Sequence, residues 1–334
     1  MAGQRIEYID AMRGFTMILV AYSHVCNYCL GDVWMGCNDV FFLFRMPCFF
    51  FISGWLFGLS GSQPFWPLVR KKFMVQIVPT FIFLLLLAPP PLFFSRLGAT
   101  KGGYWFTFAL FEYFVLYLLS VRLFKRWSGL FAVVVSVAAF CYDVLFNRYF
   151  ASMGWLTSLL GFFSFMTWRY YLFFFIGTWV RRHYEGFLHL TGRPYVMLMV
   201  VMGFCAITLI PRSDNLPLEY FIFAFGGVLG MTMVFTFFRR FARIFSRERV
   251  MGRVLQYIGT RTLDIYLLHY FFLPRFLLPF GERLRGYDSL PLEMTVALLL
   301  ALAVIGVSLL VSYVIRLSPF LAHYLFGVKY GKAG

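Results

Sequence analysis

Ten long apolar runs constrain this chain more than any other feature of its sequence. A helix needs about 20 consecutive, mainly apolar residues to cross the hydrocarbon core of a bilayer. Only 13% of the residues are charged, about half the share in a typical soluble domain. The sequence therefore predicts an all-α, polytopic membrane protein with about ten transmembrane helices. The runs lie at 9–30, 40–60, 73–95, 104–122, 129–147, 158–180, 194–211, 217–238, 254–280 and 290–318.

The region between the fifth and sixth runs leaves an alternative open. Residues 147–171 either belong to two consecutive spans or hold an interfacial helix before a shorter sixth span that starts near Met166. The first run is too long for the apolar part of a signal peptide, so we expect it to be retained as a span. The sequence contains no internal repeat and no long linker. We therefore expect one membrane domain over residues 1–334.

The distribution of Lys and Arg indicates the orientation. Short cytoplasmic loops collect these residues, and placing both termini in the cytoplasm gives 18 basic residues to the inner segments and seven to the outer loops. The net charge of +16 then reflects topology and attraction to anionic headgroups, and it gives no reason to expect a nucleic-acid partner. The inner set is Arg5, Arg70, Lys71, Lys72, Arg122, Lys125, Arg126, Arg181, Arg182, Arg193, Arg239, Arg240, Arg243, Arg247, Arg249, Arg253, Lys329 and Lys332. The outer set is Arg96, Lys101, Arg148, Arg212, Arg275, Arg283 and Arg285.

Arg13 and His24 are polar residues inside the first apolar run, where a charged side chain is costly and usually faces the protein interior. Their separation of eleven residues leaves them only about 20° apart around a helix and roughly 16 Å apart along it. Arginine suits phosphate, and histidine can take and return a proton near neutral pH. A phosphate anchor near the cytoplasmic face and a deeper base fit a substrate with a phosphorylated head and a long reactive arm, such as coenzyme A.

The same two residues also fit a structural role. A histidine in a membrane helix often forms a hydrogen bond to another helix, and an arginine one turn into a helix often extends to the interface. The spacing of Arg13 and His24 alone leaves both interpretations open.

Several further motifs accompany this pair. The chain opens with YIDAMRGFTMILVAYSH (8–24) and continues with FLFRMPCFFFISGWLF (42–57) and RKKFMVQIVP (70–79). Later come YWFTFALFEYF (104–114) and IGTRTLDIYLLH (258–269). In this order, over essentially the full length, they resemble the acyltransferase-3 family of integral-membrane O-acyltransferases. The most specific element is Arg-x10-His after the Ile-Asp-x-x-Arg-Gly opening.

The resemblance implies transfer of an acyl group, most commonly acetyl, from cytoplasmic acyl-CoA to a hydroxyl of an extracytoplasmic or lipid-linked glycan. It implies that Arg13 and His24 are the essential pair, and it places the protein in a bacterial cytoplasmic (inner) membrane. Arg13, with Arg70, Lys71 and Lys72, would hold the phosphates of coenzyme A. His24 would act as a general base or form an acyl-histidine. Departures from the family pattern are Arg45, at a position that we associate with histidine, and Arg261 and Asp264 in the ninth run.

Five other residues are supporting candidates. Asp10 lies one turn before Arg13 and either holds its guanidinium or complements the helix dipole. Arg45 either faces the acceptor and stabilises developing negative charge or extends outward. His269 has a depth similar to that of His24 and either shares its site or forms a structural hydrogen bond. Glu112 either orients one of the histidines or pairs with an arginine. Tyr266 is a weaker candidate, since such residues more often pack or anchor a helix at the interface.

Cys26, Cys29 and Cys37 lie close together at the outer end of the first run. A zinc site usually needs four ligands with paired spacing, and no second pair is present, so we expect no metal. The cysteines are either free or, for Cys37 with one of the others, oxidised in a periplasm. The chain also lacks the short motifs of nucleoside triphosphatases, dinucleotide-binding oxidoreductases and zinc proteases.

A transporter or flippase for an anionic or glycan solute is the rival interpretation. Arg13, Arg45 and His24 would then bind the solute and relay protons. Transporters often contain inverted repeats with paired broken helices. The lack of a detectable repeat favours the acyltransferase.

Overall fold

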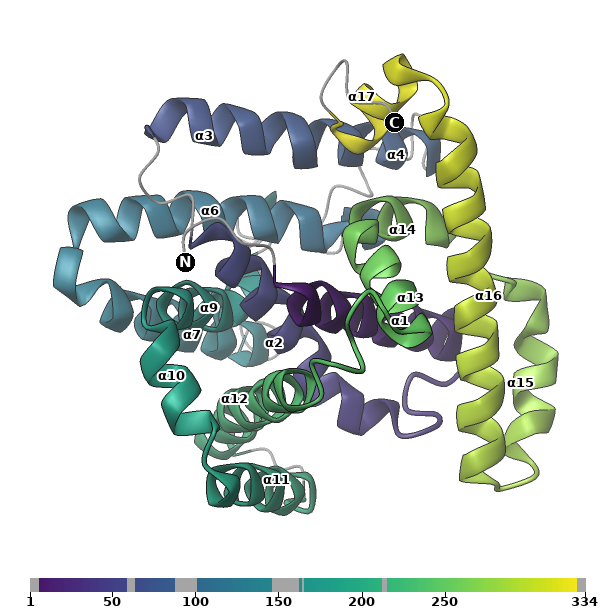
Figure 1. Ribbon diagram of the computed structural model, residues 1–334. Helices are drawn as coiled ribbons and strands as arrows, with labels where there is room; N and C mark the ends of the chain where they lie inside the picture. Colours follow the sequence, from purple (N-terminus) through teal and green to yellow (C-terminus); the bar gives the residue numbers. More distant parts are fainter. Residues whose placement is uncertain are drawn as a thin grey trace.

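The computed structural model describes residues 6–58, 64–87, 101–145, 162–163, 165–211 and 215–328, which form helices and their connections. In Figure 1, α1 and α2 cross the middle of the molecule, α3, α4 and α6 lie above them, α11 and α12 below, and α16 along one side. The helices are α1 (Glu7–Tyr28), α2 (Asn38–Phe57), α3 (Phe65–Lys72), α4 (Val78–Leu87), α6 (Trp105–Leu123), α7 (Ser128–Leu145), α9 (Tyr171–Arg182), α10 (Tyr184–Thr191), α11 (Pro194–Thr208), α12 (Leu216–Arg240), α13 (Val250–Thr260), α14 (Thr262–Leu268), α15 (Leu278–Arg285), α16 (Leu290–Arg316) and α17 (Pro319–Phe326).

Some details of the sequence predictions lie outside the described residues. These are positions 59–60 of the second predicted span, the ends of the third and fifth at 88–95 and 146–147, and the start of the sixth at 158–161. The basic residues Arg5, Arg96, Arg148, Arg212, Lys329 and Lys332 also lie outside them.

Five helices of the described chain are long and apolar enough to cross a membrane. A sixth is added if α10 and α11, which are bent by 81° at their junction, form one broken span. The five are Asn38–Phe57, Trp105–Leu123, Lys125–Asp143, Leu216–Arg240 and Leu290–Arg316. The described residues are thus all helical and fit a polytopic membrane protein, but they contain five or six candidate spans rather than the ten predicted.

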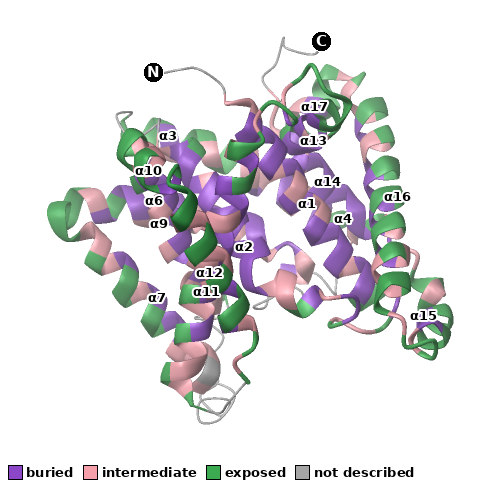
Figure 2. Cartoon of the chain, turned by 60° about the horizontal axis from the view of Figure 1, so that its bottom comes forward, coloured by how far each residue is buried: buried purple, intermediate pink, exposed green. Residues whose placement is uncertain are grey.

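The number of candidate spans is lower than predicted because several of the predicted spans are polar, short or irregular. α1 is 22 residues long, but it carries Arg13 and His24, which lower its hydropathy. It is nevertheless largely enclosed by other helices, as the buried residues along α1 and α2 in Figure 2 show. A helix packed inside a bundle does not need an apolar surface on every side.

The two alternatives for residues 147–171 differ mainly at positions that lie outside the described residues, so both stay open. In the described part, a 3-10 segment, Phe165–Tyr170, leads directly into α9, which ends at Arg182. The third predicted span begins earlier than expected, because α3 starts at Phe65 and continues through a π-helical segment, Phe73–Ile77, into α4.

The ninth predicted span, 254–280, is wrong as a single helix. It breaks at Arg261, whose φ and ψ are −110° and 17°, and α14 then passes into a 3-10 turn, His269–Phe271. Irregular backbone is tolerated at membrane depth where neighbouring protein satisfies its polar groups. Asp264 fixes α14 to α16, since its carboxylate accepts hydrogen bonds from Arg316 Nε at 2.7 Å and Nη2 at 2.9 Å, and from Ser312 Oγ at 2.5 Å.

Two helix crossings depend on glycine because the backbones touch. A Cβ on Gly14 of α1 would lie 2.0 Å from Leu255 O of α13, and one on Gly259 of α13 would lie 1.9 Å from Asp10 O of α1. α2 and α9 meet in the same reciprocal way through Gly54 and Gly177. Small residues allow this close approach between membrane helices. These glycines therefore determine which face of α1 packs against α13 and which face of α2 packs against α9.

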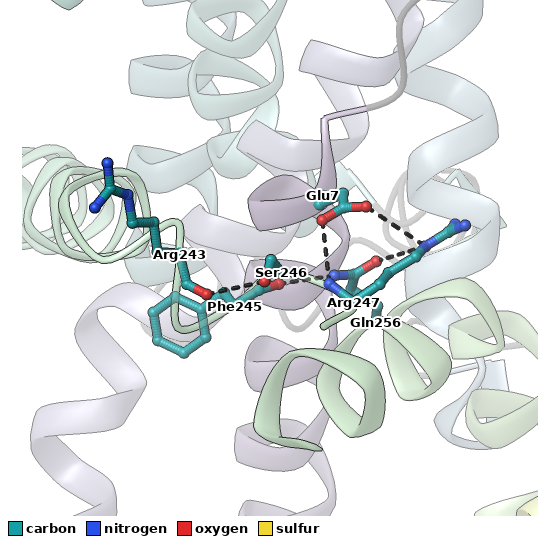
Figure 3. A network of polar contacts seen from close by, with 6 residues as sticks. All are labelled: Glu7, Arg243, Phe245, Ser246, Arg247 and Gln256. Atoms are coloured by element: carbon teal, nitrogen blue, oxygen red, sulfur yellow. Dashed lines mark hydrogen bonds and ion pairs between the residues drawn. The ribbon is translucent and has the colours of Figure 1, made fainter. Parts of the chain in front are cut away.

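The segment between α12 and α13 is attached to the start of α1 (Figure 3). The backbone N–H of Arg247 donates to Glu7 Oε2 at 3.2 Å, and its Nε donates to Gln256 Oε1 at 3.2 Å. Gln256, in α13, also donates to Phe245 O at 2.7 Å. These contacts hold α13 against α1, the helix that carries both Arg13 and His24.

Candidate active site

His24 and His269 form the polar centre of the bundle. His24 lies near the end of α1, and His269 lies at the end of α14, where that helix changes to a 3-10 turn. The Nδ1 atom of His24 is 2.7 Å from Nε2 of His269, and the two ring planes differ by 8°. His269 is fully buried. The structure therefore brings together two histidines that are 245 positions apart in the sequence.

The hydrogen-bond partners of His269 define the tautomers of both rings in their neutral forms. His269 Nδ1 lies 2.8 Å from Tyr266 O and 3.0 Å from Ile265 O, so it must be the nitrogen that carries a hydrogen. Its Nε2 is then an acceptor, and His24 Nδ1 donates to it. The remaining nitrogen, His24 Nε2, keeps a free lone pair. Backbone carbonyls thus orient His269, and His269 orients His24 as a base.

His24 lines a cavity of about 980 Å³, here called the His24 cavity. Tyr270 lies beside the base, with its hydroxyl oxygen 3.4 Å from His24 Nε2. That hydroxyl donates to Gly103 O at 3.1 Å, which leaves the lone pair of His24 Nε2 available. The other polar residues that line this cavity are Ser23, Asn27, Tyr28, Arg45, Trp105, Asp143, Thr167, Arg169, Tyr170 and Arg275.

Arg13 lines a second, smaller cavity of about 240 Å³, here called the Arg13 cavity. Lys72 shares it and lies over the ring of Phe114, with its Nζ 4.2 Å from the ring centroid. Two buried polar atoms in the residues that line this cavity have no hydrogen-bond partner among the described residues, Gln76 Oε1 and Thr262 Oγ1. Gln76 lies on the π-helical segment and Thr262 directly follows the break at Arg261. π-helical segments occur frequently at functional sites.

A partition of polar and aromatic groups separates the two cavities. Tyr266 lines the Arg13 cavity and Tyr270 the His24 cavity, yet both hydroxyls donate to the carbonyl of Gly103, at 3.0 and 3.1 Å. On the neighbouring turn, Trp105 faces the His24 cavity and Phe106 the Arg13 cavity. Among the described residues, Arg13 and His24 therefore line two different cavities, although they share one face of α1. Helix geometry places Arg13 and His24 on one face of α1, but side chains from α6 and α14 lie between the two cavities that these residues line.

The supporting candidates have different surroundings. Arg45 is 8% exposed and lines the His24 cavity, so it does not extend outward. Asp10 is buried in α1, one turn before Arg13. Arg70 and Lys71 are exposed at the end of α3 and do not line the Arg13 cavity, whereas Lys72 does.

The expectation that Glu112 orients a histidine is not what the structure shows. Glu112 Oε2 accepts a hydrogen bond from Trp168 Nε1 at 2.7 Å, while backbone carbonyls hold His269. The reason is geometric, because α6 passes with Glu112 turned towards the segment that precedes α9. Its alternative role as the partner of an arginine is also absent from the ion pairs of the described residues.

The cysteines near the site are unpaired with one another, and the Ser53 hydroxyl is engaged within its own helix. Cys26, Cys29 and Cys37 are free thiols, and the described residues contain no group of histidine, cysteine and carboxylate side chains that could hold a metal ion. Ser53 lines the Arg13 cavity, but its hydroxyl donates to Phe49 O at 2.9 Å within α2.

Sequence reasoning missed Tyr270, Gly103, Gln76 and Thr262. Tyr270 directly follows His269, so its position beside a candidate histidine was a usable signal. Gly103 has φ +100°, and a Cβ there would lie 2.7 Å from the ring of Tyr270. The adjacent pair of glycines at 102–103 was the visible sign of an unusual backbone. No sequence signal distinguished Gln76 or Thr262 from ordinary polar residues.

Residues 6–317 match the family model of the acyltransferase 3 family, which is described as an acyltransferase domain. No curated protein and no solved structure matches the chain. The match covers nearly all of the sequence and contains every residue of the two cavities. This chain therefore belongs to the acyltransferase 3 family of membrane acyltransferases.

Proposed function

We propose that this protein transfers an acyl group, most plainly acetyl, from cytoplasmic acyl-CoA to a hydroxyl of an extracytoplasmic or lipid-linked glycan. The observation that carries the proposal is the hydrogen-bonded pair His24–His269, which leaves His24 Nε2 as a base in a large cavity. Membership of the family does not identify the acceptor. Acyl transfer to a hydroxyl uses a base that can reach the hydroxyl proton, and His24 Nε2 faces a cavity where an acceptor could bind.

His24 would act on the acceptor. Its Nε2 takes the proton of the hydroxyl as the hydroxyl oxygen attacks the carbonyl carbon of the thioester. The carbon–sulfur bond then breaks, and the same nitrogen returns the proton to the departing sulfur, so that an ester and a free thiol leave. His269 stabilises the positive charge that His24 carries between these steps, because its Nε2 accepts the Nδ1 hydrogen of His24.

The Arg13 cavity has the chemistry to hold coenzyme A. Arg13 and Lys72 provide positive charge for phosphate, with Arg70 and Lys71 on the exposed end of α3 as further proposed contacts. The unpartnered Gln76 Oε1 and Thr262 Oγ1 suit a ligand with N–H donors, and the arm of coenzyme A contains two amides. A buried acceptor without a partner costs about 1–3 kcal/mol, and a bound donor group would remove that cost.

The partition between the cavities would have to open for the acyl group to reach His24. It consists of the aromatic side chains between the cavities together with the hydrogen bonds from the hydroxyls of Tyr266 and Tyr270 to Gly103 O. Lys101, Gly102 and Gly103 all have positive φ, a backbone conformation that costs little for glycine.

The orientation of the chain in the membrane remains part of the proposal. Both termini and the basic segment between α12 and α13 would face the cytoplasm, because Lys and Arg concentrate there. The Arg13 cavity then opens towards the cytoplasmic supply of acyl-CoA, and the His24 cavity towards the glycan. A transporter or flippase, the rival function, is not supported by membership of an acyltransferase family.

The test is acyl transfer by the purified, full-length protein in lipid nanodiscs. Labelled acetyl-CoA is supplied with a mixture of extracytoplasmic and lipid-linked glycans, and both thiol release and label transfer are measured. His24→Gln should lower transfer by about 10²–10⁴-fold while coenzyme A binding is kept. His183→Gln, which removes an exposed histidine outside both cavities, is the matched control. Transfer at the normal rate by His24→Gln would exclude the proposed base.

A further inference from the structure

The guanidinium of Arg45 is a buried charge that has no carboxylate partner in the part of the chain that the structure describes. The side chain is 8% exposed, and its one hydrogen bond to a described residue runs from Nη1 to Asn38 Oδ1, at 2.7 Å. It also lies 5.4 Å from the ring centroid of Phe42. Both partners are electrically neutral. The described residues include 13 of the 14 acidic residues, all except Asp214, and none of them forms an ion pair with Arg45.

The protein holds this charge in a fixed position. Asn38, at the start of α2, donates to Ser23 Oγ at 3.2 Å and to Val33 O. These bonds orient the amide so that its oxygen faces the guanidinium. Positioning a charged group through a supporting hydrogen-bond shell is typical of ligand-binding sites. A buried charge left unpaired is strongly destabilising, so a fixed and unpaired arginine indicates that its counter-charge is supplied from outside the chain.

The rest of the His24 cavity has the same sign of charge. Arg169 and Arg275 line it together with Arg45, and Asp143 is the one acidic residue among its described lining residues. Asp143 is already paired with Arg169. Arg275 is exposed and lies 5.7 Å from the ring centroid of Tyr28, with no carboxylate partner among the described residues. Arg45 and Arg275 are therefore two uncompensated positive charges in the cavity that contains the base.

We propose that the acceptor is an anion, and that Arg45 binds its carboxylate or phosphate group in the His24 cavity, with Arg275 assisting at the exposed side. This inference rests on the proposed function, since it concerns the same cavity and the hydroxyl that His24 would deprotonate. The shared chemistry is an oxyanion attached to the glycan, either an acidic sugar or a phosphate of a lipid-linked saccharide. Arginine suits both, because its planar fork matches carboxylate and phosphate oxygens.

Arg45 could instead stabilise only the negative charge that develops during the reaction. The two roles differ in the resting protein. A group that binds the acceptor's anion does so without any acyl donor present, whereas a group that acts only on the transition state gives no binding of a simple anion. The test therefore omits acyl-CoA and measures anion binding directly.

A cysteine in the His24 cavity serves as the reporter. Asn27 is exposed and lines this cavity, so Asn27→Cys is made in the full-length protein with Cys37, Cys141 and Cys205 replaced by serine. The protein is placed in nanodiscs of uncharged lipid, and the rate of modification by a neutral maleimide is measured. Methyl glucuronide, methyl glucoside and inorganic phosphate are compared as protecting probes. The first two probes share one sugar framework and differ in the carboxylate.

We expect the glucuronide, the phosphate or both to slow modification, and the glucoside to have no effect at the same concentration. Protection by the glucuronide alone indicates an acidic sugar, and protection by phosphate alone indicates a phosphorylated acceptor. Arg45→Gln should raise the half-protecting concentration about ten- to hundredfold. Arg275→Gln, an exposed change that is safe for folding, should raise it several-fold. Arg283→Gln removes a nearby exposed charge that does not line the cavity and should leave it unchanged.

The inference is overturned if neither anion protects, if the glucoside protects as well as the glucuronide, or if Arg45→Gln keeps full protection. Coenzyme A binding is measured by calorimetry on the same preparation. If coenzyme A binds but no anion protects, the proposal of an anionic acceptor is rejected and the proposed acyltransferase function still stands. Loss of both would count against the proposed function as well.

Discussion

Replacing His269 with alanine tests whether the two histidines act as one unit. His269 Nε2 accepts the Nδ1 hydrogen of His24 at 2.7 Å, and this bond becomes charge-assisted when His24 takes a proton. A hydrogen bond to a charged group contributes about 1.5–3 kcal/mol. At about 1.36 kcal/mol per tenfold change in rate, its loss should slow acyl transfer roughly 10- to 150-fold.

The assay is thiol release from acetyl-CoA by nanodisc-embedded protein, with His24→Ala and the double variant measured in parallel. If His269 acts only through His24, the double variant should be no slower than His24→Ala alone. Because His269 is fully buried, alanine also leaves a cavity, so His269→Asn serves as a second variant. Its side-chain oxygen can accept the His24 hydrogen, and it should retain more activity than alanine. The thermal stability of each variant is recorded to separate loss of fold from loss of rate.

Two results would refute this reasoning. One is a normal rate in His269→Ala with the protein still folded. The other is a double variant whose rate loss equals the product of the two single losses, which would mean that each histidine acts independently. Imidazole added to His269→Ala should restore part of the rate only if the lost group acts by hydrogen bonding to His24.

Three other outcomes are expected. Gly177→Ala should destabilise the protein by several kcal/mol, because its Cβ would lie 2.1 Å from a backbone oxygen of α2. Gly186→Ala, with open space around it, is the control and should not be destabilised. Equal melting temperatures of the two variants would contradict the close crossing of α2 and α9. Arg13→Ala should weaken coenzyme A binding in calorimetry about ten- to hundredfold and more than Arg13→Lys does, and three equal affinities for wild type and both variants would exclude a phosphate anchor. A membrane-impermeant thiol reagent applied to intact cells should label cysteines introduced at 281–289 and not at 241–253, and the reverse pattern would invert the topology.

The sequence determined the local structure and the chemistry available on each helix. The apolar runs predicted where most helices lie, since hydrophobic length and helical periodicity are local properties. The interval between Arg13 and His24 placed them on one face of α1, and the family resemblance drawn from the motifs is confirmed by the match over residues 6–317. The ordering of motifs along the chain was enough to identify the class of enzyme.

Only the tertiary structure decided which distant groups meet. His269 reaches His24 because the ninth run breaks at Arg261 and is fixed to α16 through Asp264. Glu112, at a plausible depth, instead faces Trp168. The path between Arg13 and His24 is divided into two cavities because Gly103 accepts hydrogen bonds from tyrosines of α14 and the turn after it. Each of these outcomes depends on how helices pack against one another, and packing between segments far apart in sequence leaves no periodic signal in either one.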